Sequence, residues 1–189
     1  MHSVWKTSIR FTLVTAILLG LGYPLLVTGI ATLLFPHKAG GSLIKLNDGT
    51  IIGSELLAQS FTSDRYFHPR PSAAGNGYDA TSSGGSNLAQ SSKALIDRLQ
   101  GSIDKLAKEN PGKPVPIDLV TTSASGLDPD VTPDAAYFQV PRVAKARGIG
   151  EESLRALIDR DLTSRQFGIL GEPRVNVLAL NLDLDKLPK

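Results

Sequence analysis

Serine–lysine pairs are the residues of this chain whose types and spacing come closest to catalytic chemistry. The S-x-x-K pattern of serine acyl-transfer enzymes occurs twice, as Ser42 with Lys45 and Ser102 with Lys105. The sequence has neither the S-D-N nor the K-T-G companion of those enzymes. A Ser-His-Asp triad can be drawn through His68, but the sequence has no G-x-S-x-G elbow to hold its serine. A membrane-tethered periplasmic enzyme of the serine hydrolase type remains the alternative function, but we assign no catalytic residue.

The other polar residues do not favour a metal or phosphate site, and we assign no metal ligand. None of the three histidines has a partner at metal-ligand spacing: His2, His37 and His68. Asp128, Asp130 and Asp134 lack the calcium-loop pattern and suit a solvated turn. Residues 83–86, Ser-Gly-Gly-Ser, would offer backbone N–H groups to an anion if a helix followed. They echo the S-G-G signature of ABC ATPases, but a loop that caps a helix explains them equally well.

Residues 11–35 form a run of 25 residues without a charged side chain. As a helix this run would be about 37 Å long, which is enough to cross a hydrocarbon core of about 30 Å. A cleaved secretory signal has an apolar region of only about 7–15 residues. We therefore predict a retained transmembrane helix over residues 11–35.

The residues on either side of this run bear on its orientation. Lys6 and Arg10 lie in a short tail, and short basic tails stay in the cytoplasm. Two lysines beyond the run nearly balance them, but long domains translocate largely regardless of charge. We expect residues 1–10 to form a cytoplasmic tail and residues 36–189 a domain on the outer side of the membrane. The lack of cysteine suits an oxidising compartment.

Small residues recur along the predicted transmembrane helix at spacings of four and seven. Small side chains let helices approach closely in lipid, where packing and hydrogen bonds drive their association. The spacing therefore predicts docking against partner helices, although glycine and threonine are common in membrane helices in general. Pro24 is expected to kink or loosen the helix near its middle. The predicted docking residues are Ala16, Gly20, Gly22, Pro24, Thr28 and Gly29.

The part that follows the apolar run predicts one α+β domain with a small sheet and several helices. It is long enough to bury a core. Its basic and acidic residues are mixed, with a formal net charge of +2 for the chain, so nucleic acid is a poor partner. Residues 43–46 and 50–52 predict a hairpin around an Asp-Gly turn. Residues 71–87, rich in Pro, Gly and Ser, predict a long loop.

Helical spacing predicts most of the other elements. We expect a short helix from Ser54 to Leu57, and a helix that includes Leu95 and Leu106 with Asn87 as its cap. Thr132 caps a further helix, which Pro141 should break in two. Glu151 and Glu152 open the next one, with Leu154, Leu157, Ile158 and Leu162 on one face. Buried strands are expected over residues 117–122 and 175–182.

Long strings spread along the whole chain carry a resemblance. The sequence resembles the C subunit of the bacterial Kdp potassium-transporting ATPase in length, in its N-terminal apolar run and in family-specific strings. These strings occupy residues 66–73, 83–87, 118–129, 139–147 and 175–182.

The resemblance implies an accessory subunit of an ATP-driven potassium importer, needed for assembly and stabilisation. The implied partners are a channel-like potassium-translocating subunit, a P-type ATPase catalytic subunit and a small hydrophobic subunit. This chain has neither the D-K-T-G phosphorylation motif of P-type subunits nor a T-V-G-Y-G filter, so it is expected not to be an enzyme by itself. No cofactor is expected to bind firmly.

The family also implies a way for ATP to contact this chain through the complex. A glutamine after the last predicted helix is proposed to raise the ATP affinity of the catalytic partner. Arg165 and Gln166 are the nearest match and are the predicted nucleotide-binding residues. This prediction conflicts with the expected orientation, because ATP lies in the cytoplasm.

Two loops, residues 66–87 and 118–130, are predicted to contact partner subunits, because loops carry interfaces disproportionately. The residues that we assign to these contacts are Arg70, Ser72, Asn87 and Asp128. The alternative is that Arg70 and Asp128 only fix the geometry of the loops.

Overall fold

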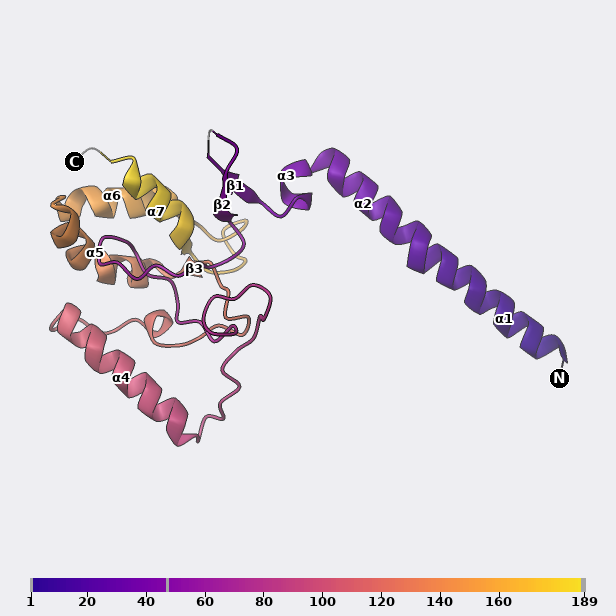
Figure 1. The fold of residues 1–189 in the computed structure, drawn as a ribbon, viewed down its shortest axis with the longest axis horizontal. Coiled ribbons are helices and arrows are strands. Elements are labelled where there is room, and N and C mark those ends of the chain that lie inside the picture. The colour runs from indigo at the N-terminus through magenta and orange to yellow at the C-terminus, as the bar shows by residue number, and fades with distance from the viewer. Residues whose placement is uncertain (1, 47, 188–189) are drawn as a thin grey trace. The chain divides into compact units, whose positions relative to one another are not determined.

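The computed structural model describes residues 2–46 and 48–187. The chain divides into two compact units, an N-terminal unit (Met1–Ser54) and a C-terminal unit (Glu55–Lys189). The N-terminal unit holds one long apolar helix and a hairpin, and the C-terminal unit combines short strands with several helices (Figure 1). The α+β prediction is therefore confirmed.

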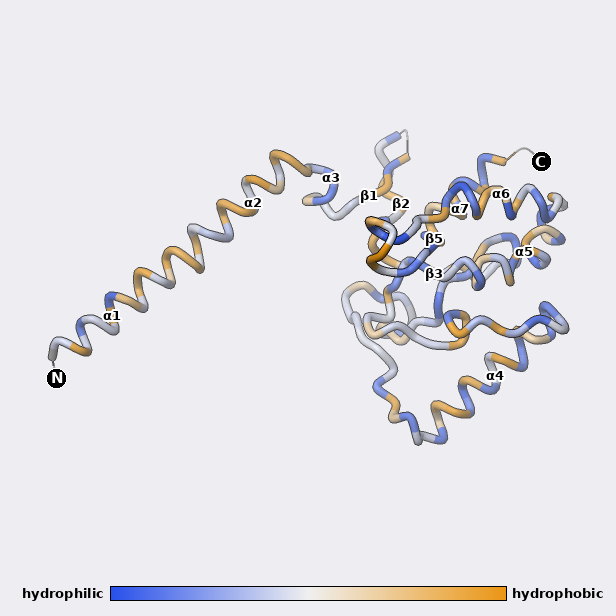
Figure 2. Tube along the Cα trace, turned by 180° about the vertical axis from the view of Figure 1, so that it is seen from behind, coloured by the Kyte–Doolittle hydropathy of each residue, from blue (hydrophilic) through white to orange (hydrophobic). Residues whose placement is uncertain are grey.

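One long helix dominates the N-terminal unit. It consists of α1 (His2–Ile17), the π-helical turn η1 (Leu18–Gly22) and α2 (Tyr23–Leu34). The stretch Ser3–Leu34 is long and apolar enough to cross a membrane. Figure 2 shows the apolar residues that follow one another along α2. The helix ends at Leu34, one residue before the predicted end of the apolar run.

The π-helical turn lies directly before Pro24. The Tyr23 N–H donates to the Leu18 carbonyl five residues earlier, instead of four. Proline has no N–H, and in an α-helix its ring clashes with the carbonyl four residues before it. The wider turn gives the ring room, so the expected loosening near Pro24 is observed as a π turn that contains Gly20 and Gly22.

A short helix and a hairpin complete the N-terminal unit. Helix α3 (Pro36–Ala39) is followed by β1 (Leu43–Lys45) and β2 (Ile51–Ser54), which pair antiparallel as predicted. Gly49 has a φ of 85°, which favours glycine, and Asp48 Oδ1 accepts a hydrogen bond from the Thr50 N–H at 2.9 Å. The first residue of the predicted turn, Asn47, lies outside the described residues.

The predicted helix from Ser54 to Leu57 is wrong, because the chain forms a turn there. Distant partners take the backbone groups that such a helix would use. The Ala58 N–H donates to the Leu127 carbonyl at 2.9 Å, and Asn176 Nδ2 donates to the Glu55 carbonyl at 2.8 Å. Residues 55–92 contain neither helix nor strand, so the predicted loop of 71–87 is confirmed within a longer irregular segment.

Helix α4 (Lys93–Glu109) confirms the predicted helix but not its cap. The residue before it is Ser92, whereas Asn87 lies further upstream with a φ of 51°. A helix cap needs extended backbone, so the left-handed φ of Asn87 does not suit that role. No residue of α4 is buried, but its C-terminal end contacts α5, where Glu109 Oε2 pairs with Arg142 Nε at 3.4 Å.

The predicted strand over residues 117–122 is also wrong. The chain forms the 3-10 turn η2 (Ile117–Leu119), and the Thr121 N–H donates back to the Ile117 carbonyl at 3.0 Å. Asp118 interrupts the apolar run and accepts a hydrogen bond from the Thr132 N–H at 2.7 Å. This contact holds the segment as a turn against the start of the next helix.

Helix α5 (Pro133–Arg147) follows the two-residue strand β3 (Asp130–Val131). Thr132 caps it as predicted, because its side chain accepts a hydrogen bond from the Ala135 N–H. The predicted break at Pro141 is wrong, since α5 continues through that residue. Buried residues on both sides of Pro141 pack into the same core, which favours one continuous helix.

The C-terminal part completes a three-stranded sheet and the core. Helix α6 (Glu151–Asp161) confirms the predicted apolar face, although Leu162 lies in the next strand. Strands β4 (Leu162–Thr163) and β5 (Arg174–Asn176) give the antiparallel order β3-β5-β4.

The predicted final strand over residues 175–182 is wrong beyond Asn176, because helix α7 (Val177–Asp185) follows. The Asn176 side chain caps α7 by accepting a hydrogen bond from the Ala179 N–H at 3.0 Å. The buried residues of α7 recur at helical spacing: Val177, Leu178, Leu180, Asn181 and Leu184.

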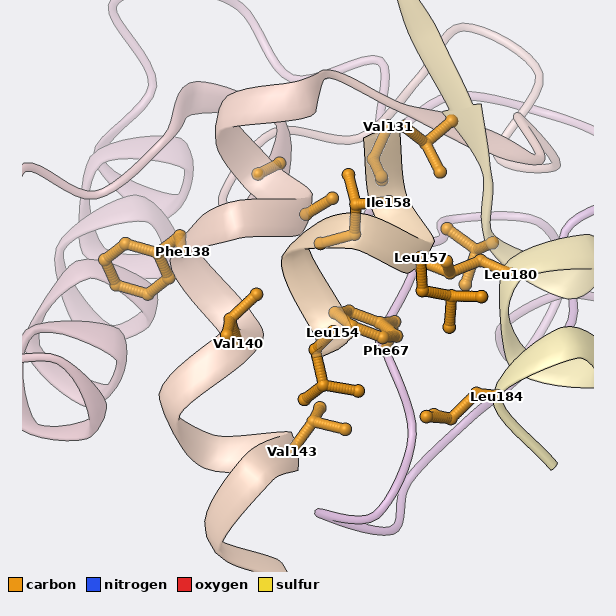
Figure 3. Close-up of a cluster of buried hydrophobic side chains, with 14 of the residues drawn as sticks. Phe67, Val131, Phe138, Val140, Val143, Leu154, Leu157, Ile158, Leu180 and Leu184 are labelled. Atoms are coloured by element: carbon orange, nitrogen blue, oxygen red, sulfur yellow. The ribbon is translucent and has the colours of Figure 1, made fainter. Parts of the chain in front are cut away.

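The hydrophobic core of the C-terminal unit lies between α5, α6 and α7. Figure 3 shows that these helices direct valine, leucine and isoleucine side chains toward Phe67, which comes from the irregular segment before them. Phe67 is fully buried. The irregular segment, residues 55–92, therefore contributes a side chain to the core and does not only connect the elements on either side of it.

Candidate functional site

Two buried amide side chains hold the backbone at Phe67 and His68. Asn181 accepts a hydrogen bond from the Phe67 N–H and donates one to the Phe67 carbonyl, each at 2.9 Å. Gln139 accepts from the His68 N–H at 2.7 Å and donates to the His68 carbonyl at 3.1 Å. Both amides are only 2% exposed. They supply the partners that a neighbouring strand would otherwise give to this extended segment.

Two arginines of α5 fix the residues just before Phe67. Arg142 Nη1 donates to the Asp64 and Tyr66 carbonyls at 2.8 and 3.0 Å. Arg147 Nε donates to the Arg65 carbonyl at 2.7 Å, and its Nη2 pairs with Asp185 of α7 at 2.6 Å. Burial, with Arg142 close by, lowers the pKa of His68.

The two loops that were predicted to meet partner subunits are bonded to each other. Arg70 Nη1 forms an ion pair with Asp128 Oδ2 at 2.9 Å, and both side chains are half-buried. The same guanidinium lies 3.4 Å from Thr121 Oγ1. We call residues 66–87 and 118–130 together the two-loop cluster. This ion pair suits the alternative that Arg70 and Asp128 fix the geometry of the loops, and their assignment to partner contacts stays a prediction.

Ser72 is the polar centre of the two-loop cluster. Its hydroxyl donates to the Gly126 carbonyl at 2.6 Å and accepts from the Tyr78 and Ala74 N–H groups at 2.8 and 3.1 Å. The Tyr78 hydroxyl donates to the Arg70 carbonyl at 2.8 Å, and burial raises the pKa of Tyr78.

The approach of the two loops is closest at Gly126. Its φ is 67°, and a Cβ atom there would lie 2.6 Å from the Gly84 carbonyl oxygen and 2.7 Å from the Ala74 nitrogen. Only glycine fits such a position without a shift of the backbone. Among the four predicted contact residues, the structure brings Arg70, Ser72 and Asp128 together and leaves Asn87 exposed at the end of its loop.

The predicted nucleotide-binding residues lie on a hairpin between β4 and β5. Arg165 pairs with Glu172 across the hairpin. The backbone of Gln166 pairs with Leu170, with hydrogen bonds of 2.8 and 2.9 Å in the two directions. Both residues thus have a structural part in closing this hairpin, and the nucleotide-binding assignment stays a prediction.

Three apolar side chains stand at the end of the same hairpin, and sequence reasoning missed them. Phe167, Ile169 and Leu170 are 91%, 75% and 54% exposed. We call these three residues the apolar tip. The available signal was the three apolar residues within residues 167–170, around Gly168, without the polar residues that turns usually carry. The clamp formed by Asn181 and Gln139 was missed as well, because its partners lie far away in sequence.

The predicted docking residues of the apolar helix Ser3–Leu34 are all exposed within the N-terminal unit. Gly20 and Gly22 lie in the π turn, and Pro24, Thr28 and Gly29 follow in α2. A Cβ atom on Gly20 or Gly29 would meet nothing within 4 Å. These glycines are therefore not required by contacts inside the unit, and docking against partner helices stays a prediction.

Ser42 of the first serine–lysine pair lies directly before β1, and its N–H donates to the His37 carbonyl at 3.0 Å. Ser102 lies within α4, and its hydroxyl donates to the Arg98 carbonyl at 3.0 Å. The His68 ring lies 3.0 Å from the carbonyl oxygen of Ser63.

In residues 2–46 and 48–187, no three His, Asp or Glu side chains gather as a group that could hold a metal ion. Residues 83–86 do not directly precede a helix, because α4 begins at Lys93.

Comparison with known proteins assigns the chain to a family. The sequence model of the family described as "K+-transporting ATPase, c chain" matches residues 5–186. The chain belongs to the KdpC family. A curated KdpC relative from Acidobacterium capsulatum, named potassium-transporting ATPase KdpC subunit, is 57% identical, and the alignment covers 96% of this chain and 97% of the relative.

Other KdpC relatives agree over nearly the full length. The relative from Koribacter versatilis is 57% identical over 95% of this chain and 92% of its own. The one from Bradyrhizobium diazoefficiens is 54% identical over 96% of both chains. The sequence segments on which the resemblance to KdpC was based contact one another in the fold. Residues 66–73 contact α5, α7 and the loop of residues 118–130. They build the scaffold of the C-terminal unit.

Proposed function

We propose that this chain is an accessory, non-catalytic subunit of an ATP-driven potassium importer, needed to assemble and stabilise the complex. The match to the KdpC family over residues 5–186 carries this proposal. The proposed partners are a channel-like potassium-translocating subunit, a P-type catalytic subunit and a small hydrophobic subunit. The exposed helix Ser3–Leu34 supports a place beside other membrane chains.

Co-purification tests the proposed function. When the chain carries an affinity tag and is extracted from its native membranes with a mild detergent, we expect it to bring down two large polytopic chains. The expected complex also retains potassium-dependent ATPase activity. Recovery of the tagged chain as a lone monomer, from membranes that contain those two chains, would overturn the proposal.

We also propose that the apolar run, residues 11–35, spans the inner membrane, with residues 1–10 in the cytoplasm and residues 36–189 outside. The natural chain has no cysteine, so a single introduced cysteine reports only its own position. Ser83 and Ser164 are exposed and lie in different loops of the C-terminal unit. We expect an impermeant thiol reagent to label Ser83→Cys and Ser164→Cys in intact spheroplasts.

A Ser3→Cys variant is the matched control for this labelling, because Ser3 lies on the opposite side of the proposed span. It should react only after the membrane is made permeable. Protection of both C-terminal positions in intact spheroplasts would reverse the proposed orientation, and it would bring Arg165 and Gln166 to the side of the membrane that holds ATP.

A further inference from the structure

The backbone of the hairpin that carries the apolar tip is closed by its own hydrogen bonds. Besides the pairing of Gln166 with Leu170, the Gly168 N–H donates to the Arg165 carbonyl at 3.1 Å and the Ile169 N–H donates to the Gln166 carbonyl at 3.2 Å. The N–H groups of Gln166, Gly168, Ile169 and Leu170 are thus paired within the hairpin. This pairing lowers the cost of moving these N–H groups into an apolar environment.

Phe167 occupies a position that suits a different residue. Its φ is 53° and that of Gly168 is 76°, and two successive positive φ values characterise the type I′ turn. Asn-Gly is the favoured pair in such turns, because a bulky residue with positive φ is strained. Phe167 is therefore unfavourable both for its backbone conformation and for its 91% exposure. The stability of the C-terminal unit does not explain a phenylalanine here.

The apolar tip could enter either a membrane surface or an apolar recess on a protein, and the charges around it distinguish these two surroundings. Residues 166–171 contain no charged side chain, and the nearest charges, Arg165 and Glu172, pair with each other. Arg174 pairs with Asp130 at 2.9 Å. Loops and helices that lie on anionic membranes combine apolar side chains with unpaired basic ones. A small, uncharged and preorganised tip instead suits an apolar recess on a protein surface.

We propose that the apolar tip inserts into an apolar recess on an integral membrane subunit of the same potassium-transporting ATPase. This inference rests on the proposed function, since it requires that the chain has such partners. It assigns a main part of the contact to Phe167, Ile169 and Leu170, and gives the two-loop cluster a structural role.

The variant Phe167→Asn separates docking from folding. Asparagine suits the turn, so we expect the C-terminal unit to unfold at the same urea concentration or a higher one. After mild detergent extraction, we expect recovery of partner chains with the tagged variant to fall by about tenfold or more, as for the loss of a central interface residue. Ile117→Ser is the matched control, because Ile117 is 70% exposed in the same unit but lies outside the tip. It should keep its partners.

A second variant tests whether the loss of partner chains comes from the missing apolar side chain and not from a changed turn conformation. Ile169 is absent from the residues with positive φ in the described chain, so Ile169→Ser removes an apolar side chain without changing the turn preference. It should lower the recovery of partner chains in the same direction. If both tip variants keep their partners as the wild type does, the inference is wrong and the proposed function stands. If the wild type itself has no partners, both are wrong.

Photocrosslinking in the assembled membrane complex identifies the molecule that contacts the apolar tip. A benzophenone attached through the single cysteine of Phe167→Cys should transfer its label to a partner polypeptide. Label found only on phospholipid would show that the tip meets the lipid surface, and would overturn the inference in favour of a membrane contact.

Discussion

Replacing Gly126 with alanine is expected to lower the free energy of unfolding of the C-terminal unit by about 2–4 kcal/mol. The added Cβ would lie 2.6 and 2.7 Å from backbone atoms of Gly84 and Ala74. Neither atom is the end of a flexible side chain, so one loop must move away from the other. That movement would disturb the hydrogen bond between Ser72 and the Gly126 carbonyl. The φ of 67° at this position is also less favourable for alanine than for glycine.

Gly148→Ala is the matched control for Gly126→Ala. Gly148 has a similar φ of 71° at the end of α5, but a Cβ atom there would meet nothing within 4 Å. It should therefore cost only about 1 kcal/mol, from the backbone conformation alone. Urea titration of the full chain in detergent, followed by circular dichroism, measures both. Equal losses in the two variants would show that the close contact between the loops is not important for stability.

Asn181→Ala is expected to lower the free energy of unfolding by about 3 kcal/mol. Alanine would leave the Phe67 N–H and carbonyl without their partners in a buried place, and would also leave a small cavity in α7. The expected loss exceeds that of an ordinary hydrogen bond, because two backbone groups are left unpaired. The same urea titration measures it.

Asn76→Ala is the control for Asn181→Ala. It removes the same amide from an exposed loop residue that is absent from the positive-φ residues of the described chain, and it should change the free energy of unfolding by less than about 0.5 kcal/mol. If Asn181→Ala unfolded at the same urea concentration as Asn76→Ala, the segment at Phe67 would not depend on α7.

The sequence predicts best those elements whose causes lie within a few residues. The cap at Thr132, the Asp-Gly turn at Asp48 and the apolar helix before them all depend on neighbouring side chains, and all are confirmed. The two mistaken strands were short apolar runs, which periodicity alone cannot assign. Long-range contacts decided them, through Asp118 in one and through the packing of Leu180 and Leu184 in the other.

The candidate site shows the same division. The sequence assigned Arg70, Ser72 and Asp128 to partner contacts, and that assignment stays a prediction. It could not show that Arg70 pairs with Asp128 or that Ser72 bonds to the Gly126 carbonyl. It drew attention to Gln166 and passed over Phe167 beside it. The exposure of Phe167 depends on the hairpin between β4 and β5, whose pairing is a property of the folded chain.

The bonds between Asn181 and Phe67 join residues that are 114 positions apart. Among the described elements of the C-terminal unit, α7 is the last to leave the ribosome. The Phe67 N–H and carbonyl therefore lack their partner until α7 has been synthesised, and the unit folds as a whole only after that point. A chain truncated before α7 would keep its N-terminal helix but remain open to proteases.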